Sequence, residues 1–111
     1  MAKELKFVML LDCYGELLTE HQRNTMELYY CEDLSLSEIS EPLGITRQAV
    51  RDLIKRTEQV LLEYEEKLGF VDRLEKMRDC FSCIGKLAGT LEDSETCDAI
   101  KAEINSALTL L

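Results

Sequence analysis

The apolar residues of this 111-residue chain recur at spacings of three and four along most of its length, and this helical period constrains the fold more than any other feature. A strand signal is nearly absent, because the chain has one proline, no Asn-Gly or Asp-Gly turn and no alternating apolar run bounded by turn residues. The longest apolar stripe consists of Val50, Leu53, Ile54, Thr57, Leu61, Tyr64 and Leu68. The sequence therefore predicts an all-α fold.

Two segments mark where helices begin. In TEHQ at 19–22 and SLSE at 35–38, a hydroxyl residue is followed three positions later by Gln or Glu, which is the pattern of a capping box. The second segment opens a short helix that ends before Gly44. Thr46 is expected to cap the next helix, which carries the longest stripe and ends at Gly69.

The remaining helices are expected at the two ends of the chain. A first helix should cover residues 4–14 and end at Gly15. Its apolar side is expected to carry Leu5, Val8 and Met9. After Gly69, one helix should run from Phe70 to Ala88. A last helix should follow an acidic loop, EDSE at 92–95, with an apolar stripe from Cys97 to Leu111.

These helices predict two parts. We expect residues 1–68 to form a helix-turn-helix domain that includes the long helix. We expect residues 69–111 to form a C-terminal helical hairpin, which either packs on the same domain or is used for dimerisation. Three apolar stripes extend beyond what a minimal helix-turn-helix needs, and a soluble chain rarely leaves such a surface exposed. The sequence therefore predicts a homodimer.

The segment SLSEISEPLGITRQAVRDLIKR, residues 35–56, predicts the helix-turn-helix itself. That motif needs a small residue where its two helices touch, here Ser40, and a glycine in the turn, here Gly44. Pro42 lies inside the first of the two helices, where it removes a backbone hydrogen bond and is expected to kink or shorten it. The aliphatic residues expected to be buried around the turn are Ile39, Leu43, Ile45, Val50 and Leu53.

The exposed side of the second helix is the candidate nucleic-acid site. Arg47, Gln48 and Arg51 could contact base edges, because arginine can bond guanine and glutamine can bond adenine in the major groove. Lys55 and Arg56 would suit phosphates, which position a protein without specifying sequence. The site residues expected from the sequence are Thr46, Arg47, Gln48, Arg51, Lys55 and Arg56.

The charge of the chain is unevenly distributed. The formal net charge is -9, yet residues 44–57 contain four basic residues and one acidic residue. The segment from residue 89 onward has five acidic residues and one lysine. Overall acidity does not exclude nucleic-acid binding, since charges are screened over about 8 Å at physiological salt. It does predict weak binding to arbitrary sequences, because few phosphates could be neutralised.

Other kinds of site find little support. The five cysteines are an odd number, and most fall at apolar helical positions where Cys acts as a small hydrophobe. Cys80 and Cys83 form a C-x-x-C without the second ligand pair of a zinc site. We therefore expect no metal, no cofactor and no enzymatic activity. With no signal peptide and no apolar run long enough for a membrane span, the chain is expected to be cytoplasmic.

The segment LLTEHQRNTMELYYCEDLSLSEISEPLGITRQAVRDLIKRTEQVLLEYEEKLGF, residues 17–70, resembles the YlxM family of small bacterial helix-turn-helix proteins. The blocks RQAVRDLIKRTE and YEEKL are especially similar, and the resemblance extends over about residues 3–78. It implies a helix-turn-helix like the promoter-recognising fourth region of bacterial sigma factors, with residues 46–56 as recognition helix. It also implies a regulatory role in the signal recognition particle pathway, because family members are usually encoded beside the genes of that particle.

Two functions remain open at this point. The first is a DNA-binding regulator that reads sequence through the second helix of the motif. The second is an accessory protein that contacts signal recognition particle RNA or protein without binding DNA. A helix cannot easily enter the deep, narrow major groove of A-form RNA, so RNA binding would depend on shape and total charge more than on Gln48.

Overall fold

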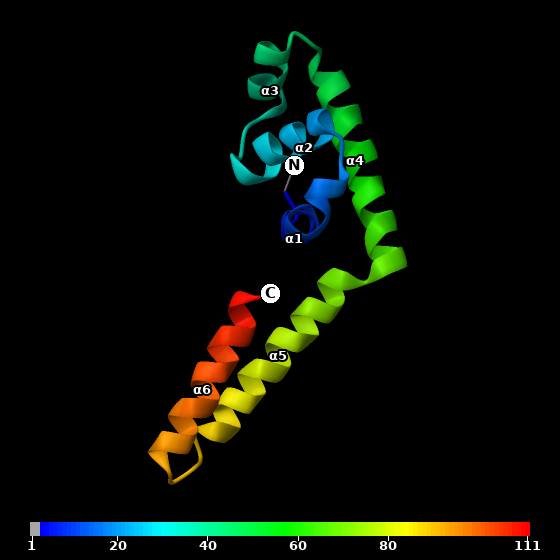
Figure 1. Ribbon diagram of the computed structural model, residues 1–111. Coiled ribbons are helices and arrows are strands. Elements are labelled where there is room, and N and C mark those ends of the chain that lie inside the picture. The colour runs from blue at the N-terminus through cyan, green and yellow to red at the C-terminus, as the bar shows by residue number, and fades with distance from the viewer. Residues whose placement is uncertain (1–2) are drawn as a thin grey trace. The chain divides into compact units, whose positions relative to one another are not determined.

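The computed structural model describes residues 3–111, and these residues form six α-helices with no strand among them (Figure 1). The all-α prediction is therefore confirmed. The helices are α1 Leu5–Tyr14, α2 Glu20–Met26, α3 Leu36–Leu43, α4 Arg47–Leu68, α5 Phe70–Ala88 and α6 Ser94–Thr109. A 3₁₀ turn, η1 Gly15–Leu17, follows α1, and a π-helical turn, η2 Glu27–Cys31, continues α2. The chain divides into two compact units, one ending at Val71 and one covering Asp72–Leu111.

In the first unit, α4 runs alongside the other helices and contacts α1, α2 and α3 (Figure 1). Its buried side chains belong to the longest stripe that the sequence predicts, except Glu58. The stripe therefore stabilises the unit by burying one face of α4 against three shorter helices, each of which contributes apolar side chains. The buried apolar core consists of Phe7, Leu10, Leu11, Tyr14, Leu18, Met26, Tyr29, Ile39, Val50, Ile54 and Leu61.

The predicted starts of α2, α3 and α4 are confirmed. Both capping boxes form, with Gln22 and Glu38 each accepting a hydrogen bond from the backbone of the residue that caps its helix. Thr46 caps α4 by accepting a hydrogen bond from the Ala49 backbone, and Gly69 ends α4 in the left-handed conformation. These caps are local in sequence, so they form wherever the residues stand at the correct spacing.

Two expectations about the helices are wrong. The buried face of α1 carries Phe7, Leu10, Leu11 and Tyr14, whereas Leu5 is exposed and Val8 and Met9 are half-buried. Apolar residues occur nearly all around α1, so spacing alone could not select the face that packs. The acidic loop is shorter than expected, because Asp93 caps α6 and Ser94 and Glu95 form its first turn.

The cysteines also differ from expectation. Cys31, Cys80 and Cys83 are exposed, Cys13 is half-buried, and Cys97 is buried. Three of the five are thus on the surface of the described chain, where they do not act as small core residues.

One cluster of hydrogen bonds fixes the end of α4 and the start of α5. The Tyr14 hydroxyl is buried, donates to Glu65 and accepts from the Phe70 backbone at 3.1 Å. The Glu65 carboxylate also accepts from the Val71 backbone at 3.1 Å. These bonds satisfy backbone groups at the first turn of α5 that have no partner within the helix. Helix α1 is thereby tied to the joint between α4 and α5.

The second unit is a helical hairpin in which α6 runs back along α5 (Figure 1). The buried apolar residues among its described positions are Ala88, Cys97 and Ile104. At Gly85 the helices approach closely, since a Cβ placed there would lie 3.8 Å from the Ile104 Cδ1 atom. None of the helices in the described part of the chain is both long enough and apolar enough to span a membrane.

Candidate nucleic-acid interface

The turn between α3 and α4 is closed by a Schellman motif around Gly44. Gly44 has a φ of 68°, its N–H bonds the Glu41 carbonyl at 3.2 Å, and the Ile45 N–H bonds the Ser40 carbonyl at 3.3 Å. Helix α3 continues one residue past Pro42 before this motif ends it. Pro42 therefore lies within the last turn of α3, and the left-handed turn at Gly44 ends the helix.

The small residue expected at the helix contact is in place. Ser40 is buried, and its hydroxyl donates to the Ser37 carbonyl at 3.1 Å within α3. Ile39 and Val50 are buried as expected, and the side chain of Leu53 is half-buried. The expectation is wrong for Leu43 and Ile45, which are exposed. Both flank the turn at the surface, where the tight reversal of the chain leaves no neighbouring helix to cover them.

All six side chains expected at the site are exposed: Thr46, Arg47, Gln48, Arg51, Lys55 and Arg56. Four of them, Thr46, Arg47, Gln48 and Arg51, line one shallow surface pocket together with Leu36 from the first turn of α3. Lys55 and Arg56 lie one helical turn further along α4. The start of α4 thus presents basic and amide groups beside the start of α3.

Several of these side chains already have intramolecular partners. The Gln48 amide donates to the Asp52 carboxylate at 2.9 Å, and Arg56 Nε donates to the Asp52 carbonyl at 3.4 Å. Asp52 therefore holds both neighbours in place along α4, and Gln48 must exchange this bond before it can contact a base. The sequence does not indicate this pairing, although the spacing of four residues between Gln48 and Asp52 permits it.

Lys55 has an intramolecular partner. Its ammonium lies 4.0 Å from the carboxylate of Glu58, which is buried and also accepts from the Tyr30 hydroxyl at 2.7 Å. Burial and this hydrogen bond raise the pKa of Tyr30 above its usual value. Lys55 is thus drawn toward Glu58, whereas Arg47 and Arg51 on the same helix extend into solvent.

The loop before α3 is held by Lys3, a residue whose importance sequence reasoning missed. Its ammonium donates to the backbone carbonyls of Tyr29 at 2.6 Å and Leu34 at 2.9 Å, and it pairs with Asp33 at 3.0 Å. Asp33 has a φ of 56°, a left-handed conformation that Asp tolerates better than most residues. The three contacts fix the loop from which α3 begins.

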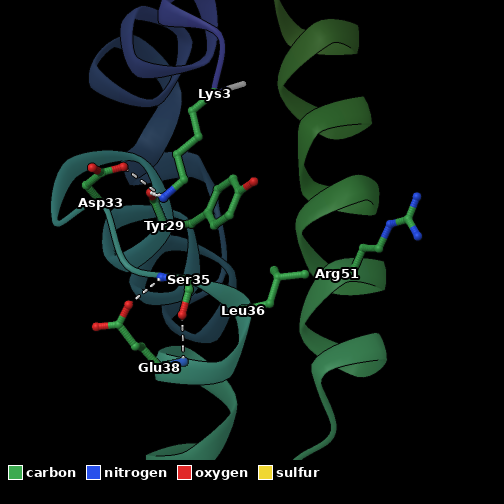
Figure 2. A pocket seen from close by; sticks show the side chains of 7 residues that line it. All are labelled: Lys3, Tyr29, Asp33, Ser35, Leu36, Glu38 and Arg51. Atoms are coloured by element: carbon green, nitrogen blue, oxygen red, sulfur yellow. Dashed lines mark hydrogen bonds and ion pairs between the residues drawn. The ribbon is translucent and has the colours of Figure 1, made fainter. Parts of the chain in front are cut away.

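Figure 2 shows this cluster, with Lys3 reaching Asp33 on the loop side. Leu36 points from α3 toward α4, and Arg51 extends from α4 away from the cluster (Figure 2). Leu36 also lines the pocket at the start of α4, while the Arg51 guanidinium is directed outward (Figure 2). Lys3 fixes the loop from which α3 begins, and α3 contacts α4, which carries the candidate residues.

The described residues contain no group of three or more His, Cys, Asp or Glu side chains arranged to hold a metal ion. Cys80 and Cys83 are exposed on α5, and His21 is exposed in the first turn of α2. The exposed side chains at the start of α4 offer hydrogen-bond donors and positive charge.

A short helix, a turn closed by a left-handed glycine and a second helix with an exposed start define the helix-turn-helix class of proteins. Comparison with known proteins agrees. The family model "Putative helix-turn-helix protein, YlxM / p13 like" (UPF0122) matches residues 1–102. The chain therefore belongs to the UPF0122 family of YlxM- and p13-like proteins.

Individual relatives give the same result. The chain is 42% identical over 113 residues to a UPF0122 protein of Clostridium acetobutylicum, covering 96% of this chain and 97% of that protein. It is 41% identical over 103 residues to the UPF0122 protein YlxM of Bacillus subtilis, covering 92% and 94%. A UPF0122 protein of Desulforamulus reducens is 60% identical over 68 residues, which span 61% of this chain and 58% of that relative.

Proposed function

We propose that this chain is a DNA-binding regulatory protein that inserts the start of α4 into the major groove of a duplex. One observation carries the proposal: two backbone hydrogen bonds close the turn before α4, and the exposed Arg47, Gln48 and Arg51 directly after it line one shallow pocket. A recognition helix contacts bases through its first turns, so this is where readers of sequence would lie. The role is binding, with no catalytic step.

Each side chain has a distinct role in this proposal. Arg47 and Arg51 extend into solvent on one side of α4 and contact base edges, and Gln48 joins them after exchanging its bond to Asp52. Arg56, and Lys55 once it leaves Glu58, contact phosphates. Thr46 positions these groups because its hydroxyl caps α4.

The proposal extends to the signal recognition particle pathway through the resemblance to the YlxM family. An accessory protein of that particle would use the same basic surface on structured RNA, or another surface on a protein. DNA is favoured because the candidate readers are concentrated at the start of the second helix of a helix-turn-helix. Binding to particle RNA or protein, with no duplex preference, is the alternative outcome of the tests below.

The experiment compares three alanine variants on duplexes selected from a random pool. Arg47→Ala should cost about 1–3 kcal/mol on the preferred duplex and relax its specificity. Lys55→Ala should weaken binding to all duplex sequences alike and should release about one counterion fewer on binding, which lowers the salt dependence of the affinity. Lys67→Ala is the matched control, because Lys67 is an exposed lysine in the last turn of the same helix.

The control variant should bind as the wild type does. If Arg47→Ala and Lys55→Ala lost the same affinity for every duplex sequence, the surface would act only through charge, and that result would contradict base reading. Preference for structured RNA over every duplex would contradict the DNA target itself.

A further inference from the structure

Helix α5 has an exposed apolar seam that the hairpin does not cover. The seam consists of apolar residues spaced by three, four and three positions, which places them on one side of the helix. They are Met77, Cys80, Ile84 and Leu87. All four are exposed, with 45% of Met77, 43% of Ile84 and 68% of Leu87 accessible. Leu91, which is 45% exposed, extends the same spacing, because hydrogen bonds of a helical type continue through the residues after α5.

This seam lies next to the side of α5 that faces α6, and Ile84 stands at the border between the two. Gly85 approaches Ile104, and Arg78 donates to the Leu111 carbonyl at 3.2 Å, so the residues beside them face the other helix. Phe81 and Ile84 also border an apolar groove with Thr96, Ala99, Ile100, Glu103 and Ile104 of α6. The hairpin therefore has an apolar face that includes the seam.

The seam has the repeat of a coiled coil. Apolar residues alternating at three and four occupy the a and d positions of a heptad, and such a seam packs best against another helix with the same repeat. A second copy of this chain offers that partner, because its own α5 carries the identical seam. A two-fold contact between identical surfaces is also the commonest way in which soluble proteins assemble.

Charge decides the direction of the pairing. Arg73 lies on the seam, seven residues before Cys80 and four before Met77. In a parallel pair, Arg73 would meet its own copy, which is repulsive. In an antiparallel pair centred between Cys80 and Ile84, Met77 faces Leu87 of the second copy and Arg73 faces Leu91, which directly precedes the acidic residues Glu92 and Asp93.

We infer that two copies of this chain associate through an antiparallel, two-fold contact between their α5 helices, with Arg73 of each copy beside Glu92 of the other. The contact buries Met77, Cys80, Ile84 and Leu87 of both copies. It does not depend on the proposed function, because none of the residues involved lies on α4. Failure of DNA binding would therefore leave this inference unaffected.

The test measures the mass of the full-length chain by sedimentation equilibrium. The wild type should be a dimer at tens of micromolar, and Ile84→Glu should be a monomer with an unchanged helical circular dichroism signal. Ser82→Glu is the matched control, because Ser82 is exposed two residues away and lies outside the seam; it should remain a dimer. A wild type that stays monomeric at high micromolar concentration would overturn the inference.

A charge exchange tests the direction and remains informative if Ile84→Glu disturbs the hairpin. Arg73→Glu alone and Glu92→Arg alone should each weaken the dimer several-fold. The double variant Arg73→Glu, Glu92→Arg should restore it, because the attractive pair is re-formed with its signs reversed. A parallel dimer would respond differently: Arg73→Glu would not be rescued by Glu92→Arg, and that result would overturn the antiparallel contact.

Discussion

Alanine at Gly44 should destabilise the first unit through backbone conformation alone. Gly44 closes the turn between α3 and α4 with a φ of 68°, where side-chain-bearing residues are disfavoured. A Cβ at this position would meet no atom within 4 Å. Gly69 offers a matched comparison in the same unit, since its φ is 64° and its Cβ position is equally empty.

The magnitude follows from two opposing terms. A left-handed conformation costs an alanine about 1–2 kcal/mol. Alanine has less conformational freedom than glycine in the unfolded chain, which stabilises the folded state by about 0.4–1 kcal/mol. Since no steric clash adds to this, each variant should lose about 1 kcal/mol, which lowers the melting temperature of a unit of this size by roughly 4–8 °C. Asparagine tolerates the conformation better, so Gly44→Asn should lose less.

The assay is urea denaturation of the full chain, monitored by circular dichroism. It compares Gly44→Ala, Gly69→Ala and the corresponding asparagine variants. The two alanine variants should lose similar free energies of unfolding, and asparagine should recover part of each loss. If Gly44→Ala were as stable as the wild type, the turn could not be left-handed. If Gly44→Ala lost several times more than Gly69→Ala, a contact absent from the structure would be responsible.

Three further predictions concern the cap, an internal tyrosine and the cysteines. Thr46→Ala should cost about 1 kcal/mol, measured by urea denaturation, whereas Thr46→Ser should keep the bond from Ala49 and most of the stability. Burial and the hydrogen bond to Glu65 raise the pKa of Tyr14 from 10.0 to about 12. The folded state therefore holds the Tyr14 proton more tightly than the unfolded state. The contribution of this tyrosine to the free energy of unfolding is complete below pH 10 and is lost as the pH rises toward 12. Tyr14→Phe should reduce the pH dependence of the free energy of unfolding in that window, and an unchanged dependence would contradict the assignment. Chelator treatment should leave the melting temperature unchanged, and stoichiometric zinc in the purified protein would contradict this.

Features that depend on near neighbours could be predicted from the sequence. Both capping boxes, the Thr46 cap and the end of α4 before Gly69 follow from residues within one turn of each other. The stripe of α4 was predictable because polar residues surround it and leave one apolar face. The exposure of the six candidate residues follows from the same pattern, since they lie outside that stripe.

Features set by distant contacts could not be predicted. The sequence LKFVMLLDCY of α1 is apolar on most sides, so its buried face is selected by packing on α4 rather than by spacing. The bond from Tyr14 to Glu65 joins residues 51 positions apart, and Lys3 reaches Leu34 across 31 positions. Neither pair leaves a local signal. The attraction of Lys55 to Glu58 likewise depends on Tyr30, which holds the carboxylate from another element.

The central claim is that the exposed start of α4 reads duplex DNA, and selection from a random duplex pool tests it most directly. The full-length chain is incubated with the pool, and the bound duplexes are recovered and sequenced, alongside a parallel selection with Arg47→Ala. The wild type should enrich one short sequence motif, and Arg47→Ala should lose the base preference at one or two positions of that motif. Recovery of duplexes with no shared motif, or an identical motif with the variant, would contradict base reading by α4.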